Sequence, residues 1–185
     1  MKYHRAWLEE EFRRKAKQRF LFFWGHQAAK DGSLSSSCFS QWWPAPFMVG
    51  GHKYATAEHW MMRQKALLFH DTAIAAKIAE ATSPKQAKEL GRKVSGFDND
   101  LWNKEKYRIV LAGSVAKFGQ SPSLKDFLLN TGNRILIEAS PVDRIWGIGM
   151  AADDAGAENP LLWRGENLLG FALMEARDQL RAGRS

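Results

Sequence analysis

The pattern of apolar and polar residues predicts that the chain begins with a helix and then a strand. Residues 5–19 are rich in charge and carry Trp7, Leu8 and Phe12 among the charged positions, which is typical of an amphipathic helix. The aromatic run at 20–24 has the character of a short strand. The turn-like stretch that follows is too short to link two domains.

A glycine pair then predicts a β-hairpin. Gly50–Gly51 separates two short runs, 47–49 and 53–55, that suit paired strands. Thr56 comes directly afterwards, and its side chain is well suited to cap the start of a helix. We therefore expect a helix over residues 57–69.

The rest of the chain is mostly helical in pattern. Ser83 and Gln86 have the spacing of a capping box, with Pro84 at the first helical position. Asp100 suits the start of a long helix. The remaining predicted elements are helices at 73–81, 84–91, 100–118, from 122 onward and 166–180, a strand at 135–139, and a strand or glycine-rich loop at 145–149.

These elements predict an α+β fold: a predominantly helical single domain with a small β-hairpin or sheet. The alternating βαβ pattern of a dinucleotide-binding fold is missing. We expect residues 1–19 to form a basic helical extension and residues 20–185 to form the domain. The chain starts without a signal-peptide pattern, and its apolar runs are far shorter than the ~20 residues that cross a membrane. A cytoplasmic protein is expected.

Composition adds an unusual combination of aromatic and basic residues. The 185 residues include 27 Lys and Arg against 20 Asp and Glu, a net charge of +7, with eight Trp and eleven Phe. Aromatic rings and cations together favour an anionic partner that carries rings, such as a nucleotide. A basic protein with a tryptophan-rich core is the alternative. The single cysteine, Cys38, cannot form an internal disulfide and is expected to be an inert thiol.

The first candidate for chemistry is the helix after Thr56. Glu58, Met62 and Lys65 fall at i, i+4 and i+7 and share one face. The rise of a helix over seven residues places the Glu58 carboxylate and the Lys65 ammonium roughly 10 Å apart along the axis. This separation spans a ribosyl carbon and its 5′-phosphate. The alternative is structural, because an acidic residue in a first turn also stabilises the helix dipole.

A second candidate is the helix after Asp100. Trp102, Lys106 and Gly113 follow one stripe, and Lys117 lies close to it. A tryptophan with two cations below it can stack on a base and hold phosphate. A buried tryptophan beside solvated lysines is the alternative.

The loop from Ser140 to Met150 is the third candidate. Asp143 precedes an aromatic residue and two glycines, Gly147 and Gly149, which allow a ligand to approach the backbone closely. An isolated G-x-G is weak evidence, and a turn-capping aspartate is the alternative.

Several familiar chemistries are unsupported by the sequence. The five histidines show no i, i+4 pair and no H-E-x-x-H arrangement, so no metal site is expected. Neither the G-x-S-x-G nucleophile motif nor a phosphate-binding P-loop motif is present. Carboxylate chemistry and plain binding are the functions left open.

Four blocks of the sequence, the second made of two stretches, resemble in order the conserved blocks of the NADAR superfamily, the YbiA-like N-glycosidases. They cover most of the chain from about residue 20 to residue 181. The resembling segments are FSQWWPAPFMVGGHKYATAEHWMMRQKA at 39–66, the stretches at 90–102 and 115–132, IEASPVDRIWGIG at 137–149 and NLLGFALMEARDQL at 167–180.

The resemblance implies hydrolysis of the bond between a ribose C1′ and a nitrogenous group, without a metal or redox cofactor. Members of this family act on phosphoribosylated intermediates of riboflavin biosynthesis, or remove ADP-ribose from guanine in DNA. The family's essential carboxylates correspond to Glu58 and Asp143, and its functional tryptophan to Trp102. Substrate-binding positions carried over in the same way are Lys65, Arg92, Lys106, Lys117, Trp146, Gly147, Gly149 and Asn167.

From this resemblance we expect Glu58 to stabilise or protonate the reacting centre. Asp143 would orient water or the ribose hydroxyls, and Trp102 would stack on the leaving ring. The sequence departs from the family at Met61, Met62 and Arg63, where an aromatic residue and a glutamine are usual. Gln41 stands where asparagine is common. These changes alter the pocket wall and bear on substrate choice more than on reaction type.

Three alternatives stay open. The net charge favours an extended polyanionic substrate, such as ADP-ribosylated single-stranded DNA, over a small riboflavin-pathway intermediate. A non-catalytic ADP-ribose or NAD sensor would keep Trp102 and the cations without hydrolysis. A general nucleic-acid-binding module would present exposed aromatic residues on strands.

Overall fold

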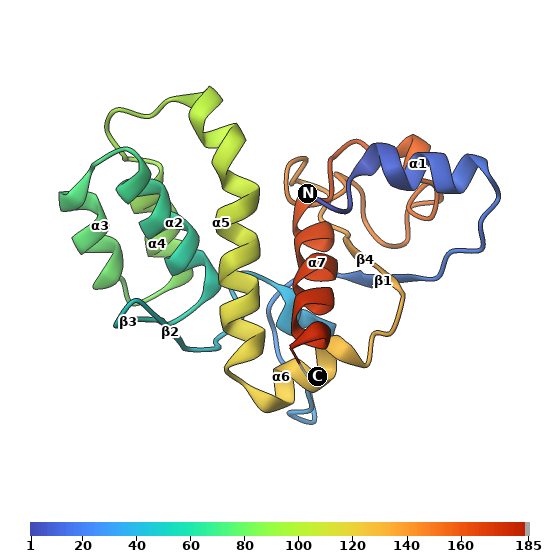
Figure 1. Cartoon of the computed structure of the whole chain (residues 1–185), viewed down its shortest axis with the longest axis horizontal. Helices are drawn as coiled ribbons and strands as arrows, with labels where there is room; N and C mark the ends of the chain where they lie inside the picture. The colour runs from blue at the N-terminus through green and yellow to red at the C-terminus, as the bar shows by residue number, and fades with distance from the viewer. Residues whose placement is uncertain (184–185) are drawn as a thin grey trace. The chain divides into compact units, whose positions relative to one another are not determined.

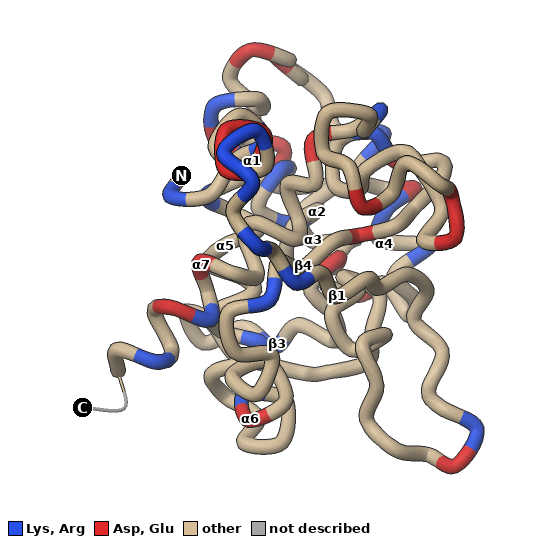
Figure 2. Tube along the Cα trace, turned by 90° about the vertical axis from the view of Figure 1, so that its right-hand side faces the viewer, with Lys and Arg blue, Asp and Glu red and all other residues tan. Residues whose placement is uncertain are grey.

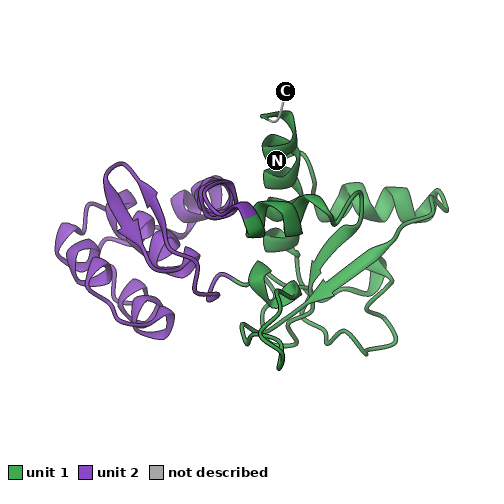
Figure 3. Ribbon diagram, turned by 90° about the horizontal axis from the view of Figure 1, so that it is seen from below, with its two compact units in different colours: residues 1–40, 123–185 green, residues 41–122 purple. Residues whose placement is uncertain are grey.

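The computed structural model describes residues 1–183, and the chain divides into two compact units (Figure 3). Unit 1 contains residues 1–40 and the chain from residue 123 onward, whereas unit 2 contains residues 41–122. The predicted α+β class, predominantly helical with small sheets, is confirmed (Figure 1). The boundary expected near residue 20, between extension and domain, stays a prediction.

Unit 1 is built around a two-stranded sheet. Its strands β1 and β4 run parallel and pair from Phe20 with Ile135 to Phe23 with Glu138. All but the last residue of β4 are buried, and α7 packs against this strand. The elements of this unit are α1 (Arg5–Arg13), β1 (Phe20–Phe23), the short 3₁₀ helix η1 (Ser36–Phe39), α6 (Pro122–Leu129, except its first residue), β4 (Ile135–Glu138), the 3₁₀ helix η2 (Pro160–Leu162) and α7 (Leu168–Ala182).

Unit 2 is a hairpin with four helices. The predicted hairpin is confirmed, with Phe47 paired to Tyr54 and Val49 to His52. Helix α2 is central, because α3, α4 and α5 all pack against it. The elements are β2 (Phe47–Val49), β3 (His52–Tyr54), α2 (Ala57–Leu68), α3 (Thr72–Ala79), α4 (Pro84–Gly91) and α5 (Asn99–Gly119).

Trp60 fixes the approach of α5 to α2. Its indole Nε1–H donates a hydrogen bond to the carbonyl of Ile109 over 2.7 Å. A Cβ atom on Gly113 would lie 2.4 Å from the Trp60 ring, so the absence of a side chain there makes the close packing possible. Gly91 of α4 gives Met62 of α2 room in the same way. The glycines set the spacing of the helices that carry candidate site residues.

Two predicted helix boundaries are wrong. The helix expected over 5–19 ends at Arg13, because Lys15 adopts a left-handed backbone with φ of 57°. The long helix begins one residue before Asp100, and its cap is Asp98, whose carboxylate accepts from the N–H groups of Asp100 and Leu101. Two aspartates flank Asn99 in this pattern, and the first one caps the helix.

The capping box and the segment at 145–149 also differ in detail. Ser83 accepts from the Gln86 N–H as expected, but the Gln86 side chain accepts from Thr82 instead of reaching back to Ser83. Residues 145–149 form the expected loop alternative and no strand. Among residues 1–183, no helix is both long and apolar enough to span a bilayer.

Candidate active site

Glu58 occupies the first turn of α2 and is buried. Thr56 caps this helix by accepting from the His59 N–H, as the sequence predicts. The Glu58 N–H, one of the donors that a helix start leaves without an internal partner, donates to the Gln41 carbonyl over 3.0 Å. The side chain is 3% exposed. The helix start therefore holds a carboxylate inside the protein, where its charge is weakly screened.

His59, the next residue, is held in different surroundings. Its ring nitrogens contact the Thr56 hydroxyl at 2.8 Å and the Ala81 carbonyl at 3.0 Å. Because Ala81 offers an acceptor, Nε2 carries the hydrogen, and Nδ1 accepts from the hydroxyl. Burial lowers the pKa of His59 below its ordinary value, while the bond to Ala81 raises it by less. The ring is therefore neutral near pH 7.

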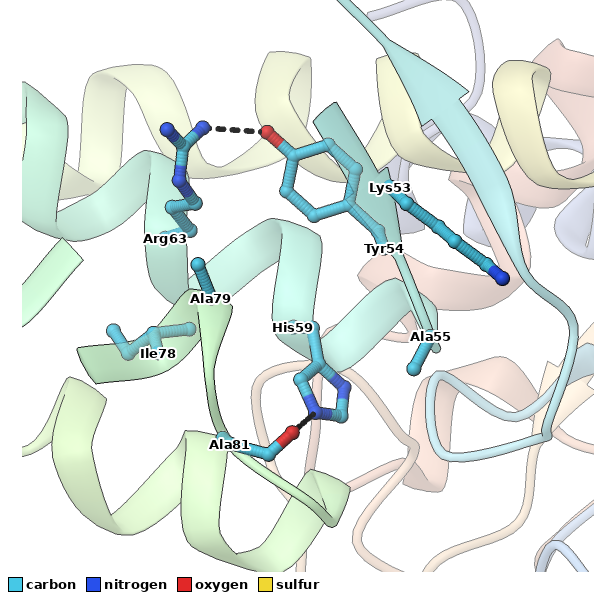
Figure 4. Close-up of a pocket in the computed structure, with 8 residues that line it drawn as sticks. All are labelled: Lys53, Tyr54, Ala55, His59, Arg63, Ile78, Ala79 and Ala81. Carbon is cyan, nitrogen blue, oxygen red and sulfur yellow. Dashed lines mark hydrogen bonds between the residues drawn. The ribbon is translucent and has the colours of Figure 1, made fainter. Parts of the chain in front are cut away.

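A pocket of about 270 Å³ lies beside His59 in unit 2. Figure 4 shows Arg63 and Tyr54 together at one end of this pocket, with His59 and Ala81 at the other. The Arg63 guanidinium donates to the Tyr54 hydroxyl over 2.7 Å. Arg63 is one of the positions at which the sequence departs from the family that it resembles, and Glu58 is not among the lining residues. The two neighbours Glu58 and His59 thus face different surroundings.

Lys65 and Trp102, predicted site residues on two separate helices, come together in unit 2. The Lys65 Nζ lies 5.7 Å from the Trp102 ring centroid and 4.4 Å from that of Phe97. It also donates to the Gly91 carbonyl over 2.9 Å. Burial lowers the pKa of the Lys65 ammonium. The result is a half-buried cation that lies close to two aromatic rings, two turns along α2 from Glu58.

The other cationic candidates of unit 2 differ in exposure. Lys117 is 2% exposed, and its Nζ lies 5.0 Å from the Phe118 ring centroid. Lys106 is half-buried and donates to Asn103 over 2.7 Å. Arg92, by contrast, is exposed directly after α4. Of these three cations, Lys117 is therefore the one that the protein encloses.

Asp143 organises a loop of unit 1. Its Oδ1 accepts from the N–H groups of Ile145 and Trp146, both over 2.8 Å. Its own N–H donates to the Ser140 hydroxyl. The turn-capping alternative is thus present in the structure. A carboxylate fixed through one oxygen keeps a defined orientation, which a structural and a functional role both require.

The glycines of this loop are tightly packed. A Cβ atom on Gly147 would lie 2.8 Å from the Glu138 carbonyl, and Gly149 has a φ of +67° that disfavours other residues. Trp146 is half-buried between them and Asp143. These positions have clear structural reasons to be glycine, and a role in binding substrate stays a prediction.

Asn167 joins α7 to β4. It is fully buried and adopts a left-handed backbone with φ of 54°. Its side chain donates to the Leu136 carbonyl and accepts from the Glu138 N–H, both over 2.9 Å. Both polar atoms of the amide therefore bond to backbone groups of β4, and these contacts serve the fold.

Phe97 is the residue of this arrangement that sequence reasoning missed. It lies in the loop between α4 and α5, and its ring is one of the two that lie close to the Lys65 ammonium. Loop residues carry no periodicity, so the one available signal was a large apolar residue, 45% exposed, in the polar segment SGFDND.

Within residues 1–183, no group of three or more His, Cys, Asp or Glu side chains is placed to hold a metal ion.

Comparison with known proteins agrees with the sequence resemblance. The model of the NADAR domain matches residues 22–181, a range that includes Glu58 and Asp143. An N-glycosidase of Acanthamoeba polyphaga mimivirus is 41% identical over 166 residues, which cover 87% of this chain and 96% of the relative. An N-glycosidase of Nostoc punctiforme is 33% identical, over 78% of this chain and 85% of the relative.

A solved structure supports the same relationship. The NMR structure of YbiA from Escherichia coli matches with a TM-score of 0.72 at 28% identity, over 91% of this chain and 89% of that one. With a domain match over most of its length and relatives above 30% identity, the chain belongs to the NADAR family.

Proposed function

We propose that the chain hydrolyses the bond between a ribose C1′ and a nitrogen atom of an ADP-ribosylated or phosphoribosylated substrate, with carboxylates as its catalytic groups. The general activity rests on the family: curated relatives bear the name N-glycosidase, and the chain is a hydrolase of N-glycosyl bonds. The substrate and the roles of individual residues are our proposal.

The buried carboxylate of Glu58 is the observation that carries the mechanism. Cleavage of a ribosyl C–N bond passes through a centre with oxocarbenium character, and a carboxylate held in a weakly screened place stabilises that positive charge. Glu58 is 3% exposed in the first turn of a helix. We assign it to stabilising or protonating the reacting centre.

The position of Lys65 beside two aromatic rings supports a substrate that carries phosphate. Lys65 lies on the same helix as Glu58 and is fixed by the Gly91 carbonyl and two aromatic rings. A lysine whose ammonium is partly desolvated gains more from a phosphate than one in water, because screening is weaker. In our proposal Lys65 holds phosphate, and Trp102 stacks on the leaving ring.

Asp143 is assigned to orienting water or the ribose hydroxyls. Two backbone N–H groups hold its Oδ1, so rotation of the carboxylate is restricted. A general base that is fixed in this way contributes roughly 10²–10⁴-fold. Between substrates, we favour ADP-ribosylated single-stranded DNA over the smaller ribosylamino-pyrimidine, because the net charge of +7 attracts a polyanion.

One experiment tests activity, substrate and the principal residue together. The purified protein is incubated separately with ADP-ribosylated single-stranded DNA and with the ribosylamino-pyrimidine intermediate, and released sugar or base is detected by mass spectrometry. Glu58→Gln keeps the shape and removes the charge, so we expect at least about a 100-fold loss of rate. Glu89→Gln, an exposed residue of α4, is the control and keeps full rate.

Release of product by a folded Glu58→Gln protein at the wild-type rate would reject the assignment. Binding of ADP-ribose without release of product from either substrate would instead support a sensor.

A further inference from the structure

The parallel pairing of β1 with β4 brings two arginines side by side. Because Phe20 pairs with Ile135, the residues just before the strands, Arg19 and Arg134, are neighbours at the same edge of the sheet. The Ile135 N–H donates to the Arg19 carbonyl over 2.9 Å, which extends the pairing to this position. Adjacent strands are about 4.8 Å apart, so two cations are held close together.

A pocket of about 360 Å³ lies at this edge. It is lined by three cations and two amides, and no carboxylate lines it: Lys17, Gln18, Arg19, Asn133 and Arg134. The size is at the lower end of the range for small-molecule pockets, roughly 300–1,000 Å³. Such a lining offers hydrogen-bond donors and positive charge to an anion.

Arg134 is preorganised. Its Nε donates to the Thr131 carbonyl over 2.9 Å, and its Nη2 donates to the Asn130 carbonyl over 3.1 Å. A guanidinium that is already fixed loses little conformational freedom when it binds. These two bonds leave both Nη1 hydrogens and one Nη2 hydrogen of Arg134 to donate to a ligand.

Further positive charge converges on the same edge from α7. Arg177 donates to the Arg134 carbonyl, and Arg181 donates to the Gly132 carbonyl. Burial lowers the pKa of Arg177, and the nearby charges of Arg181 and Arg134 lower it further, against the opposite effect of Asp178. Two arginines of α7 therefore bond to backbone carbonyls at this edge.

The cations of this pocket are not neutralised by carboxylates. Within the described part of the chain, Lys17, Arg19 and Arg134 form no ion pair, and the trace between α1 and β1 carries basic but no acidic positions (Figure 2). Helix α1 and its cap residue Arg14 differ, because their arginines pair with glutamates one turn away: Arg5 and Arg13 with Glu9, and Arg14 with Glu10 and Glu11. Like charges gathered without a partner repel, and an anionic ligand removes that repulsion.

We propose that Lys17, Arg19 and Arg134 form a phosphate-binding site at the edge of the β1–β4 sheet. Guanidinium groups bind phosphate oxygens through paired N–H donors, and the lysine adds a point charge. Lys17 and Arg19 precede the residues that match the family domain, 22–181, so the site uses a part of the chain outside that match. The phosphate belongs to a nucleic-acid strand or to a free pyrophosphate, and the test separates the two.

The test compares Lys17→Ala/Arg19→Ala with Lys30→Ala/Lys85→Ala, a control that removes the same charge from exposed lysines elsewhere. Fluorescence anisotropy follows binding of a labelled, unmodified single-stranded oligonucleotide over a series of salt concentrations. The logarithm of affinity falls with the logarithm of salt by about 0.7 per phosphate neutralised on a single strand. The site variant lacks two cations, so the slope of log affinity against log salt should be shallower by about 1.4 in this variant. The control variant should keep the wild-type slope.

Calorimetry with inorganic pyrophosphate is the second arm. If the wild type binds pyrophosphate and the site variant does not, free phosphate is a ligand of the site. If the wild type binds the oligonucleotide but not pyrophosphate, the ligand is the nucleic-acid strand. Wild-type slope and affinity in the site variant, with unchanged pyrophosphate binding, would overturn the proposal. Because the oligonucleotide carries no ADP-ribosyl group, this result is independent of whether the chain hydrolyses N-glycosyl bonds.

Discussion

The buried ring of His59 makes the stability of the protein depend on pH. Its pKa is lowered in the folded state, chiefly by burial, so the unfolded chain takes up a proton at a higher pH than the folded protein does. Stability from this residue is complete above the unfolded pKa, about 6.5, and is lost as the pH falls toward the folded value. The loss reaches at most about 1.4 kcal/mol per pH unit.

We therefore expect the free energy of unfolding of the wild type to fall between pH 7 and pH 5, and the fall to be smaller in His59→Gln. Urea denaturation at several pH values measures both. His70→Asn is the control, because His70 is exposed and asparagine tolerates its left-handed backbone. A His59→Gln protein that retains the wild-type pH dependence would show that another group titrates in this range.

At the scale of elements, the side chain of Asn167 connects the start of helix α7 to strand β4. It bonds to two backbone groups of β4 from the residue that precedes α7. Asn167→Ala removes both hydrogen bonds, leaves buried backbone groups without them, and places alanine at a positive φ. Buried groups of this kind cost about 1–3 kcal/mol, and the backbone conformation adds about 1.

Because two buried groups each lose a partner, we expect Asn167→Ala to lower the free energy of unfolding by about 3–7 kcal/mol in urea denaturation. Asn99→Ala, at an exposed position in the first turn of α5, should change it by less than about 0.5 kcal/mol. Unchanged stability with weakened substrate binding would assign Asn167 to the substrate instead of to the fold.

Local signals were sufficient for the elements that depend on a few neighbouring residues. Gly50–Gly51 predicted the hairpin, and Thr56 and Ser83 predicted the starts of α2 and α4, because turns and caps depend on local backbone chemistry. The early end of α1 was not predictable from periodicity, because the amphipathic pattern continues past Lys15, which turns left-handed.

The candidate site was predictable residue by residue but not as an arrangement. The resemblance identified Lys65 and Trp102 separately, and their meeting depends on how α2, α4 and α5 pack. Phe97 had no pattern of its own. The parallel pairing of β1 with β4, and with it the meeting of Arg19 and Arg134, joins distant parts of the chain that no local signal connects.

At the scale of the whole molecule, the first residues of the chain are fastened to its last helix. The Tyr3 hydroxyl donates to the Asp178 carboxylate over 2.7 Å, and Lys2 pairs with the same carboxylate. The Lys2 N–H donates to Glu175 over 3.0 Å. Helix α1 also packs against η2. The segment before the family domain is thus part of the folded structure of unit 1.

Tyr3→Phe removes one hydrogen bond to a charged acceptor and keeps the contact of the ring with Trp7. We expect a loss of about 1 kcal/mol in the free energy of unfolding, since the pair is partly exposed. Asp178→Asn and the double variant complete a cycle in urea denaturation. Losses that add fully would show that the two side chains do not interact.

The order of the units along the chain has a consequence for synthesis on the ribosome. Unit 2 is continuous, at 41–122, whereas the sheet of unit 1 needs β1 from one end and β4 from the other. At about 5–20 residues per second, β1 waits on the order of ten seconds for its partner. During that time an aromatic strand has unpaired backbone groups, so β1 stays open to pairing with other chains until residue 138 has emerged.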